Sequence, residues 1–249
     1  MNSTEVVVIN WKRPLNVARI VAALKAQSEP CTITVCDCHP SRDFELDDET
    51  LTLVDRLYRW THNCGAYSRY VPVGAYDHQF TLFLDDDMLP GIRCVEHFVR
   101  NAKRGNFGVL GQIGRIILPD GIYCPRDVCR SENFLKTDII IRGYFVSTKN
   151  LYNVQRLRWM LNYFDEALPE DDLLLCTSML VCADLASYLT PWDADEETLI
   201  NKQELSTEHA LSKRPDHFRK REEFIRRVMR FGWKPLYASD SSEGLSAPF

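Results

Sequence analysis

The sequence predicts an α/β fold in which a mixed, mostly parallel β-sheet is flanked by helices. Two short β-branched segments, residues 6–10 and 32–36, are separated by an amphipathic segment of helical periodicity. A third apolar segment, residues 80–84, ends in three consecutive carboxylates. In open α/β sheets, ligands bind outside the carboxyl ends of the strands. We therefore expect these segments to place a functional site at one edge of the sheet.

The first half of the chain supplies a strand–helix–strand unit. Residues 6–10 are rich in β-branched side chains and stop at a loop, after which Pro14 begins a helix. Apolar side chains form a broad face of this helix until residues 27–30 end it. The next strand, residues 32–36, ends at Asp37. A polar residue at each strand exit is typical of nucleotide-binding α/β units.

The segment at residues 80–91 carries the strongest functional signal. Five mostly apolar residues run into Asp85, Asp86 and Asp87 and then a Pro-Gly pair, which predicts a buried central strand ending in a loop. Adjacent carboxylates repel one another unless a cation neutralises them. Mg²⁺ and Mn²⁺ take few protein ligands and keep phosphate oxygens, so the pattern predicts a metal-bound nucleotide diphosphate. The alternative is a solvated acidic turn.

Arg69 lies between the second strand and the acidic triplet, and turn residues Asn63 and Gly65 precede it. A guanidinium fork at this place could clamp a diphosphate, because its geometry matches phosphate oxygens. The alternative is an exposed helix charge.

The second half of the chain continues the alternation of elements. We expect a helix at residues 95–102, a strand at 109–111, a long irregular excursion at 119–135, a strand at 138–146 and a helix at 151–164. Glu170 and Asp171 precede a further apolar helix, where acids either belong to a site or stabilise the helix dipole. Arg221 lies in a basic C-terminal helix, and the alternative to a functional role is a solvated face.

The composition limits the class of protein. The chain has 249 residues, 45% hydrophobic and 26% charged, which predicts one globular domain over residues 1–237 and a tail at 238–249. The net charge of −5 argues against a nucleic-acid partner. Nine cysteines, with no secretory signal and no transmembrane segment, predict free thiols in a cytoplasmic protein. The cysteine spacing lacks the pattern of a zinc site.

These motifs resemble those of nucleotide-sugar-dependent glycosyltransferases of the GT-A type, and in particular the exostosin-like group. The acidic strand end at residues 84–87 is similar to the group's metal-binding DDD motif, and Asn63 followed by Arg69 resembles its diphosphate segment. Residues 218–225 and 231–236 resemble its Arg-rich helix and its Gly-x-x-Pro-Leu ending. The likeness extends from residue 6 to about residue 236.

The resemblance implies a Rossmann-like GT-A domain with a nucleotide-binding half, residues 1–90, and an acceptor-binding half, residues 91–237. It implies a UDP-sugar donor, a Mn²⁺ or Mg²⁺ ion, and a glycan or glycoprotein acceptor. The sequence departs from the group in having Phe224 where the group usually has Cys, and in lacking a membrane anchor or lumenal targeting, so we expect a cytosolic pathway of a bacterium or virus. The implied donor-binding residues are Arg13, Asp37, Asn63, Arg69, Asp85 and Asp86, the implied metal ligands are Asp87 and Asp85, and the implied catalytic residues are Asp171 and Arg221.

The chemistry of glycosyl transfer agrees with these roles. Charge accumulates on the leaving diphosphate, and a metal ion with Arg69 and Arg221 is suited to neutralise it. Asp171 would accept the proton of the acceptor hydroxyl in an inverting enzyme, or hold sugar hydroxyls in a retaining one, and the resemblance favours retention. His209 and His217 are candidates for an additional metal ligand, with a surface histidine as the alternative.

Two other functions remain open. A sugar nucleotidylyltransferase also holds carboxylates and a metal at a sheet edge, but residues 11–14 lack the Gly-rich phosphate loop expected of it. A noncatalytic nucleotide- or sugar-binding module is the second alternative, against which the presence of Asp171 and Arg221 argues.

Overall fold

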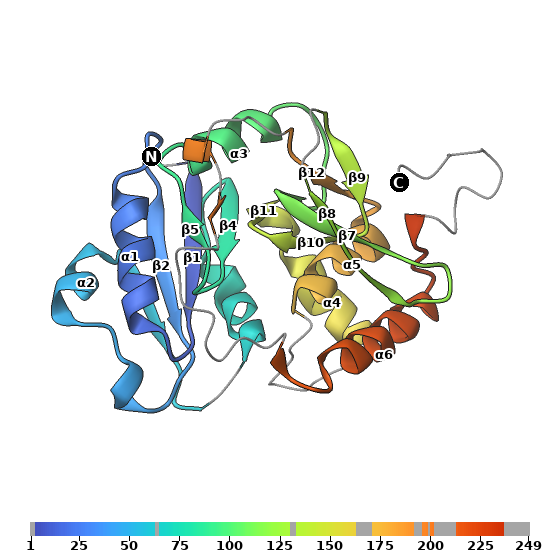
Figure 1. The fold of residues 1–249 in the computed structure, drawn as a ribbon, viewed down its shortest axis with the longest axis horizontal. Coiled ribbons are helices and arrows are strands. Elements are labelled where there is room, and N and C mark those ends of the chain that lie inside the picture. Colours follow the sequence, from blue (N-terminus) through green and yellow to red (C-terminus); the bar gives the residue numbers. More distant parts are fainter. Residues whose placement is uncertain are drawn as a thin grey trace.

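An eight-stranded sheet forms the centre of the molecule in the computed structural model (Figure 1). The structure describes residues 3–62, 65–129, 133–162, 171–191, 196–198, 200–201 and 213–236. The predicted tail at 238–249 lies outside these residues.

The strands are β1 (Thr4–Asn10), β2 (Thr32–Asp37), β3 (Arg56–Arg59), β4 (Phe80–Leu84), β5 (Leu89–Pro90), β6 (Leu110–Gly111), β7 (Ile113–Ile117), β8 (Tyr123–Cys129), β9 (Leu135–Thr137), β10 (Ile139–Arg142), β11 (Tyr144–Ser147), β12 (Ser187–Leu189) and β13 (Ile200–Asn201). The α-helices are α1 (Pro14–Lys25), α2 (Asp48–Leu53), α3 (Cys94–Ala102), α4 (Tyr152–Met160), α5 (Asp171–Ala183) and α6 (His217–Met229). Short 3-10 segments are η1 (Arg42–Phe44), η2 (Ala66–Ala75), η3 (Thr148–Asn150) and η4 (Glu196–Thr198).

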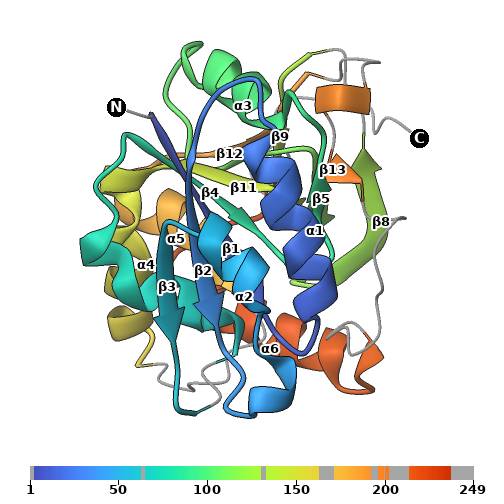
Figure 2. The same cartoon turned by 90° about the vertical axis from the view of Figure 1, so that its left-hand side faces the viewer.

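The main sheet has the strand order β3-β2-β1-β4-β11-β6-β12-β9. Strands β3, β2, β1 and β4 are parallel neighbours, and β12 is parallel to β6. Only β11 and β9 run against their neighbours in this sheet. Figure 2 shows α1 and α2 in front of the parallel strands and α4 and α5 behind them. The predicted mixed, mostly parallel sheet flanked by helices is therefore confirmed.

The core lies at the centre of this sheet. Every residue of β1 and β4 is buried, because helices cover both faces of the parallel strands. Phe145 of β11 stacks on Phe98 of α3, with ring centroids 5.3 Å apart and an interplanar angle of 7°. This aromatic pair fixes α3 against the second half of the sheet and contributes about 0.5–1.5 kcal/mol beyond its burial.

Two expectations for the second half were wrong. The irregular excursion predicted at residues 119–135 contains β8, which pairs with β7 in a separate three-stranded sheet with β10. The single strand predicted at residues 138–146 is two strands, β10 and β11, divided at Gly143. Gly143 has φ 67°, and a Cβ there would approach Ile200 Cδ1 to 2.4 Å, so the chain turns from one sheet to the other at a residue without a side chain.

The structure describes the side chains of six cysteines, and five of them are buried. Cys31, Cys36, Cys38, Cys94 and Cys176 are free and buried, which is typical of small apolar side chains rather than of a disulfide framework. Within the described ranges, no helix combines the length and the apolar composition needed to cross a membrane.

Candidate active site

The loops that follow β1 and β4 meet at the carboxyl edge of the sheet. The Trp11 N–H donates to Asp86 Oδ2 at 3.1 Å, and Asn16 Nδ2 donates to the Asp86 carbonyl at 2.9 Å. Arg13 Nη1 donates to Asp86 Oδ1 at 2.5 Å and lies 3.5 Å from Asp87 Oδ2. Because β1 and β4 are parallel neighbours, residues 75 positions apart in the chain form one loop cluster.

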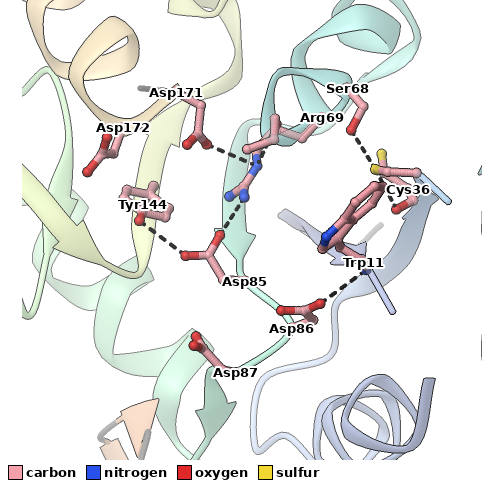
Figure 3. A network of polar contacts seen from close by, with 12 residues as sticks. Trp11, Cys36, Ser68, Arg69, Asp85, Asp86, Asp87, Tyr144, Asp171 and Asp172 are labelled. Atoms are coloured by element: carbon pink, nitrogen blue, oxygen red, sulfur yellow. Dashed lines mark hydrogen bonds and ion pairs between the residues drawn. The ribbon is translucent and has the colours of Figure 1, made fainter. Parts of the chain in front are cut away.

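The acidic triplet divides its side chains between two directions (Figure 3). Asp86 points toward Trp11, whereas Asp85 and Asp87 project from the opposite side of the chain. Burial raises the pKa of Asp86 to about 7, even though the neighbouring Arg13 guanidinium lowers it. Asp85 keeps 31% of its side chain exposed, while the Asp87 side chain is 8% exposed. The triplet is thus not a freely solvated turn.

Arg69 lies next to Asp85 of this triplet, and it is one of the largest fully buried side chains. Its Nη2 donates to Asp85 Oδ1, and its Nε lies 3.4 Å from Asp171 Oδ2. The Tyr76 hydroxyl holds the Arg69 carbonyl at 2.7 Å, which fixes η2 at this position. Burial lowers the pKa of Arg69, but the charges of Asp171 and Asp85 outweigh burial and raise it well above its ordinary value. The alternative of an exposed helix charge is excluded.

Tyr144 is a site residue that the sequence did not reveal. Its hydroxyl donates to Asp85 Oδ2 at 3.3 Å, so Asp85 has Arg69 on one oxygen and Tyr144 on the other. Tyr144 is the first residue of β11, which lies next to β4. The sequence predicts a strand there, and residues 142–151 resemble the acceptor-side segment of the exostosin-like group, but neither signal assigns a role to this tyrosine.

Asp171 begins α5 on the far side of Arg69 from Asp85. Burial raises the pKa of Asp171 to about 7, with Arg69 as the main opposing influence. Its Oδ2 is buried and accepts no hydrogen bond within the described residues. A buried carboxylate that titrates near neutral pH is suited to general-base chemistry.

Arg221 is buried in α6 and forms a bidentate pair with Asp172. Its Nη1 donates to Asp172 Oδ1 at 2.9 Å, its Nη2 donates to Asp172 Oδ2 at 2.6 Å, and Nη2 also donates to the Tyr123 hydroxyl at 2.8 Å. Neighbouring Arg219 and Lys220 have side chains that are 62% and 41% exposed. The solvated-face alternative therefore holds for those two residues and not for Arg221. Sequence reasoning missed the roles of Asp172 and Tyr123, and the only available signal was the position of Asp172 next to Asp171.

Asp37 ends β2 at the same edge but contacts a different set of residues. Asn10 Nδ2 donates to Asp37 Oδ1 at 3.1 Å, and Arg59 Nε lies 3.4 Å from Asp37 Oδ2. Burial raises the pKa of Asp37. Asn63 and His209 lie outside the described residues. His217 is partly buried beside Phe218, and burial lowers its pKa.

The triplet offers the right donors for a hard divalent ion. Asp85 and Asp87 place carboxylate oxygens on one side of the loop, and Mg²⁺ or Mn²⁺ sites at phosphates need only one or two protein carboxylates. Within the described residues, the one cluster of three side chains that could together hold a metal ion lies near the start of β1, at the amino edge of the sheet. It consists of Glu5, Asp77 and His78. Arg56 already pairs with both carboxylates there, at 3.3 and 3.0 Å. Asp85 and Asp87 are also paired, with Arg69 and Arg13, so a metal ion at these two residues would be held mainly by a phosphate ligand.

Fold and site together define an α/β protein with a candidate ligand site at the carboxyl ends of β1 and β4, between which the strand order changes direction. Solved structures with this fold include S. aureus TarS. Residues 1–349 of TarS in complex with UDP-GlcNAc match with a TM-score of 0.58 and 14% identity, covering 91% of this chain and 66% of that one. The complex of the same TarS segment with UDP has a TM-score of 0.52 and 15% identity, covering 78% of this chain and 61% of that one.

This chain therefore spans less than two thirds of each TarS structure. No protein family and no curated protein matches the sequence. The likeness shows the fold, and the narrower resemblance to the exostosin-like group stays a prediction.

Proposed function

We propose that this protein is a metal-dependent glycosyltransferase that moves a sugar from a UDP-sugar to a glycan or glycoprotein acceptor. The observation that carries the proposal is the carboxylate–guanidinium–carboxylate arrangement of Asp85, Arg69 and Asp171 at the carboxyl edge of the sheet. It sets a donor-side acid and an acceptor-side acid on opposite sides of one buried cation. The TarS structures with UDP and UDP-GlcNAc support a nucleotide-sugar ligand for a site on this fold.

The donor would lie along the exits of β1, β2 and β4. Asp37, with Arg13 and Asn63, is proposed to bind the uridine, and Asp86 the ribose or sugar. Arg13 already holds Asp86 and lies against Asp87, so it fixes the loop on which the diphosphate would rest. Asp85 and Asp87 would hold a Mn²⁺ or Mg²⁺ ion, which supplies neutralisation of the diphosphate charge.

Asp171 is proposed to face the acceptor. In an inverting reaction the acceptor oxygen forms the new bond to C1, the bond between C1 and the phosphate oxygen breaks with its electrons leaving on UDP, and the hydroxyl proton goes to Asp171. In a retaining reaction the same carboxylate would hold acceptor or sugar hydroxyls. The raised pKa of Asp171, about 7, suits it to exchange a proton near neutral pH.

Arg221 is proposed to stabilise charge on the leaving diphosphate. Its two terminal nitrogens are held by Asp172 and Tyr123, while its Nε is buried and has no hydrogen-bond partner within the described residues. Arg69 is likewise oriented by its two carboxylates and has a buried Nη1 without such a partner. Donors held in fixed directions in a site with little water are the groups that stabilise developing charge most strongly.

The test is calorimetric titration of the protein with UDP, with Mn²⁺ and with chelator. We expect UDP to bind more tightly with the metal, and Asp87→Asn to lose most of this difference. Asp48→Asn, which changes an exposed carboxylate in the first turn of α2, is the matched control and should retain it. Equal affinity with metal and with chelator would refute the metal-dependent part of the proposal.

A panel of UDP- and GDP-sugars then tests the activity itself. Release of UDP from one sugar nucleotide, accelerated by an acceptor, is the expected result. Formation of a sugar nucleotide from a sugar phosphate and a nucleoside triphosphate would show a nucleotidylyltransferase instead. Binding of a nucleotide sugar with no turnover would favour a noncatalytic module.

A further inference from the structure

Asp172 and Arg221 form a buried ion pair between the start of α5 and the middle of α6. Asp172 is 6% exposed and Arg221 is 4% exposed. Both carboxylate oxygens accept from the guanidinium, at 2.9 and 2.6 Å, and Asp172 Oδ1 also accepts from the Leu173 N–H at 2.8 Å. Both carboxylate oxygens of Asp172 therefore have donors, from the Arg221 guanidinium of α6 and from the Leu173 N–H of its own helix, and this fixes the orientation of the side chain.

Tyr123 extends the pair to the small sheet. Its hydroxyl accepts from Arg221 Nη2 at 2.8 Å, and the Arg221 guanidinium lies 4.5 Å from the Tyr123 ring centroid. Arg115 of β7 lies 4.8 Å from the same ring centroid. A single tyrosine therefore contacts two guanidinium groups, and the cluster joins α5, α6, β7 and β8.

Asp171 and Asp172 are consecutive, but their carboxylates diverge (Figure 3). Asp172 turns to α6, which leaves Asp171 facing the site. The charged and titratable groups around Asp171 are Arg69 and Tyr70 from η2, Asp85 after β4, Tyr144 from β11, Arg221 from α6 and Asp172 itself. Removing a charge from the Asp172–Arg221 pair therefore changes the charge next to Asp171. It also changes the contacts of the first turn of α5, which carries Asp171.

We propose that Asp172 and Tyr123 are positioning residues, which hold Arg221 and the first turn of α5 so that Asp171 faces the acceptor side of the site. The proposal rests on the proposed function only for its kinetic readout. The direction of Asp171 and its titration are properties of the protein without substrate, so they can be measured even if no transfer is found.

The test is Asp172→Asn, which keeps the shape of the side chain and removes its charge. Asp172 raises the pKa of Asp171 and Arg221 lowers it. Losing the Asp172 charge, and freeing Arg221 from it, should therefore move the titration of Asp171 to lower pH in carboxyl-detected NMR of the ligand-free protein. We expect kcat to fall by about tenfold or more with the donor KM little changed, because a misplaced group loses rate before it loses binding.

The matched control is Asp216→Asn, the same substitution in an exposed ion pair with Lys220, 3.1 Å apart at the start of α6. It should change neither the Asp171 titration nor kcat. Tyr123→Phe removes only the hydroxyl contact with Arg221, and it decides the question if Asp172→Asn does not fold. We expect it to lower kcat with the donor KM unchanged.

A merely structural pair would give a different result. In that case folded Asp172→Asn would melt at a lower temperature but show the wild-type titration of Asp171, and Tyr123→Phe would show the wild-type kcat. Either result in a folded variant overturns the proposal. Absence of transfer activity in the wild type would refute the proposed function, while the shift of the Asp171 titration would still decide this inference.

Discussion

Replacement of Arg69 by glutamine tests the carboxylate–guanidinium–carboxylate arrangement. Arg69 is 1% exposed, and the side chains of Asp171 and Asp85 are 11% and 31% exposed. Removing one member of a buried ion pair typically costs about 3–5 kcal/mol, because it leaves an uncompensated charge. Since water reaches about a third of Asp85, we discount its share and expect a loss of about 3 kcal/mol in urea unfolding followed by circular dichroism.

The pH dependence of this loss follows from Asp171. Its folded-state pKa is already raised to about 7, and Arg69 is the main group that lowers it. Without Arg69 the pKa of Asp171 rises further, so the Asp171 carboxyl group stays protonated at neutral pH. The variant then loses stability as the pH rises through this higher pKa. The stability difference from wild type should therefore be larger at pH 9 than at pH 6.

Adding Asp171→Asn to the Arg69→Gln variant removes the uncompensated carboxylate and should recover about 1–2 kcal/mol. Lys25→Gln is the control, because its pair with Asp55 is 39% and 43% exposed, and its loss should be at most about 1 kcal/mol. If Arg69→Gln costs no more than Lys25→Gln, or if the double variant shows simple additivity, the reasoning about the buried cation is wrong.

Three further predictions concern single residues. Asp171→Asn should leave UDP affinity nearly unchanged and lower transfer by about a hundredfold or more, and a wild-type rate would remove Asp171 from the mechanism. Arg221→Ala should reduce transfer far more than Arg219→Ala or Lys220→Ala, and equal effects would indicate diffuse basicity. The folded-state pKa of Asp138 is raised by burial from 3.8 to about 6, so it contributes stability at pH 4 that is lost as the pH rises through about 6. Asp138→Asn should therefore make the fall in unfolding free energy over this range shallower, and an unchanged slope would contradict the assignment.

The first half of the fold could be predicted because its signals are local. The β-branched run in β1, Pro14 at the start of α1 and the apolar run in β4 each identify an element from neighbouring residues alone. The second half depends on longer-range geometry. The turn at Gly143 requires knowledge that Ile200 packs against it, and β8 forms because β7 lies beside it, although prolines and charges in residues 119–135 suggest a loop.

The residues of the candidate site also differ in whether local sequence predicts them. The acidic triplet and Asp171 could be named from the sequence because they stand beside apolar segments. The burial of Arg69 and the pairing of Arg221 with Asp172 could not, since each depends on partners that tertiary structure brings close, 49 residues apart for Arg221 and Asp172. A basic helix looks the same whether one arginine points inward or none does, and the sequence of α6 alone does not distinguish these cases.

The place of β11 in the sheet has a consequence for synthesis of the chain. β4 pairs with β1 on one side, and its other edge is covered only when β11 docks antiparallel to it. A nascent chain that ends shortly after β4 exposes a row of unpaired N–H and C=O groups on an apolar strand, which is a template for aggregation. That edge stays open until Tyr144–Ser147 leaves the ribosome. At roughly 5–20 residues per second this exposure lasts for several seconds, so the N-terminal half cannot complete its folding ahead of the rest of the chain.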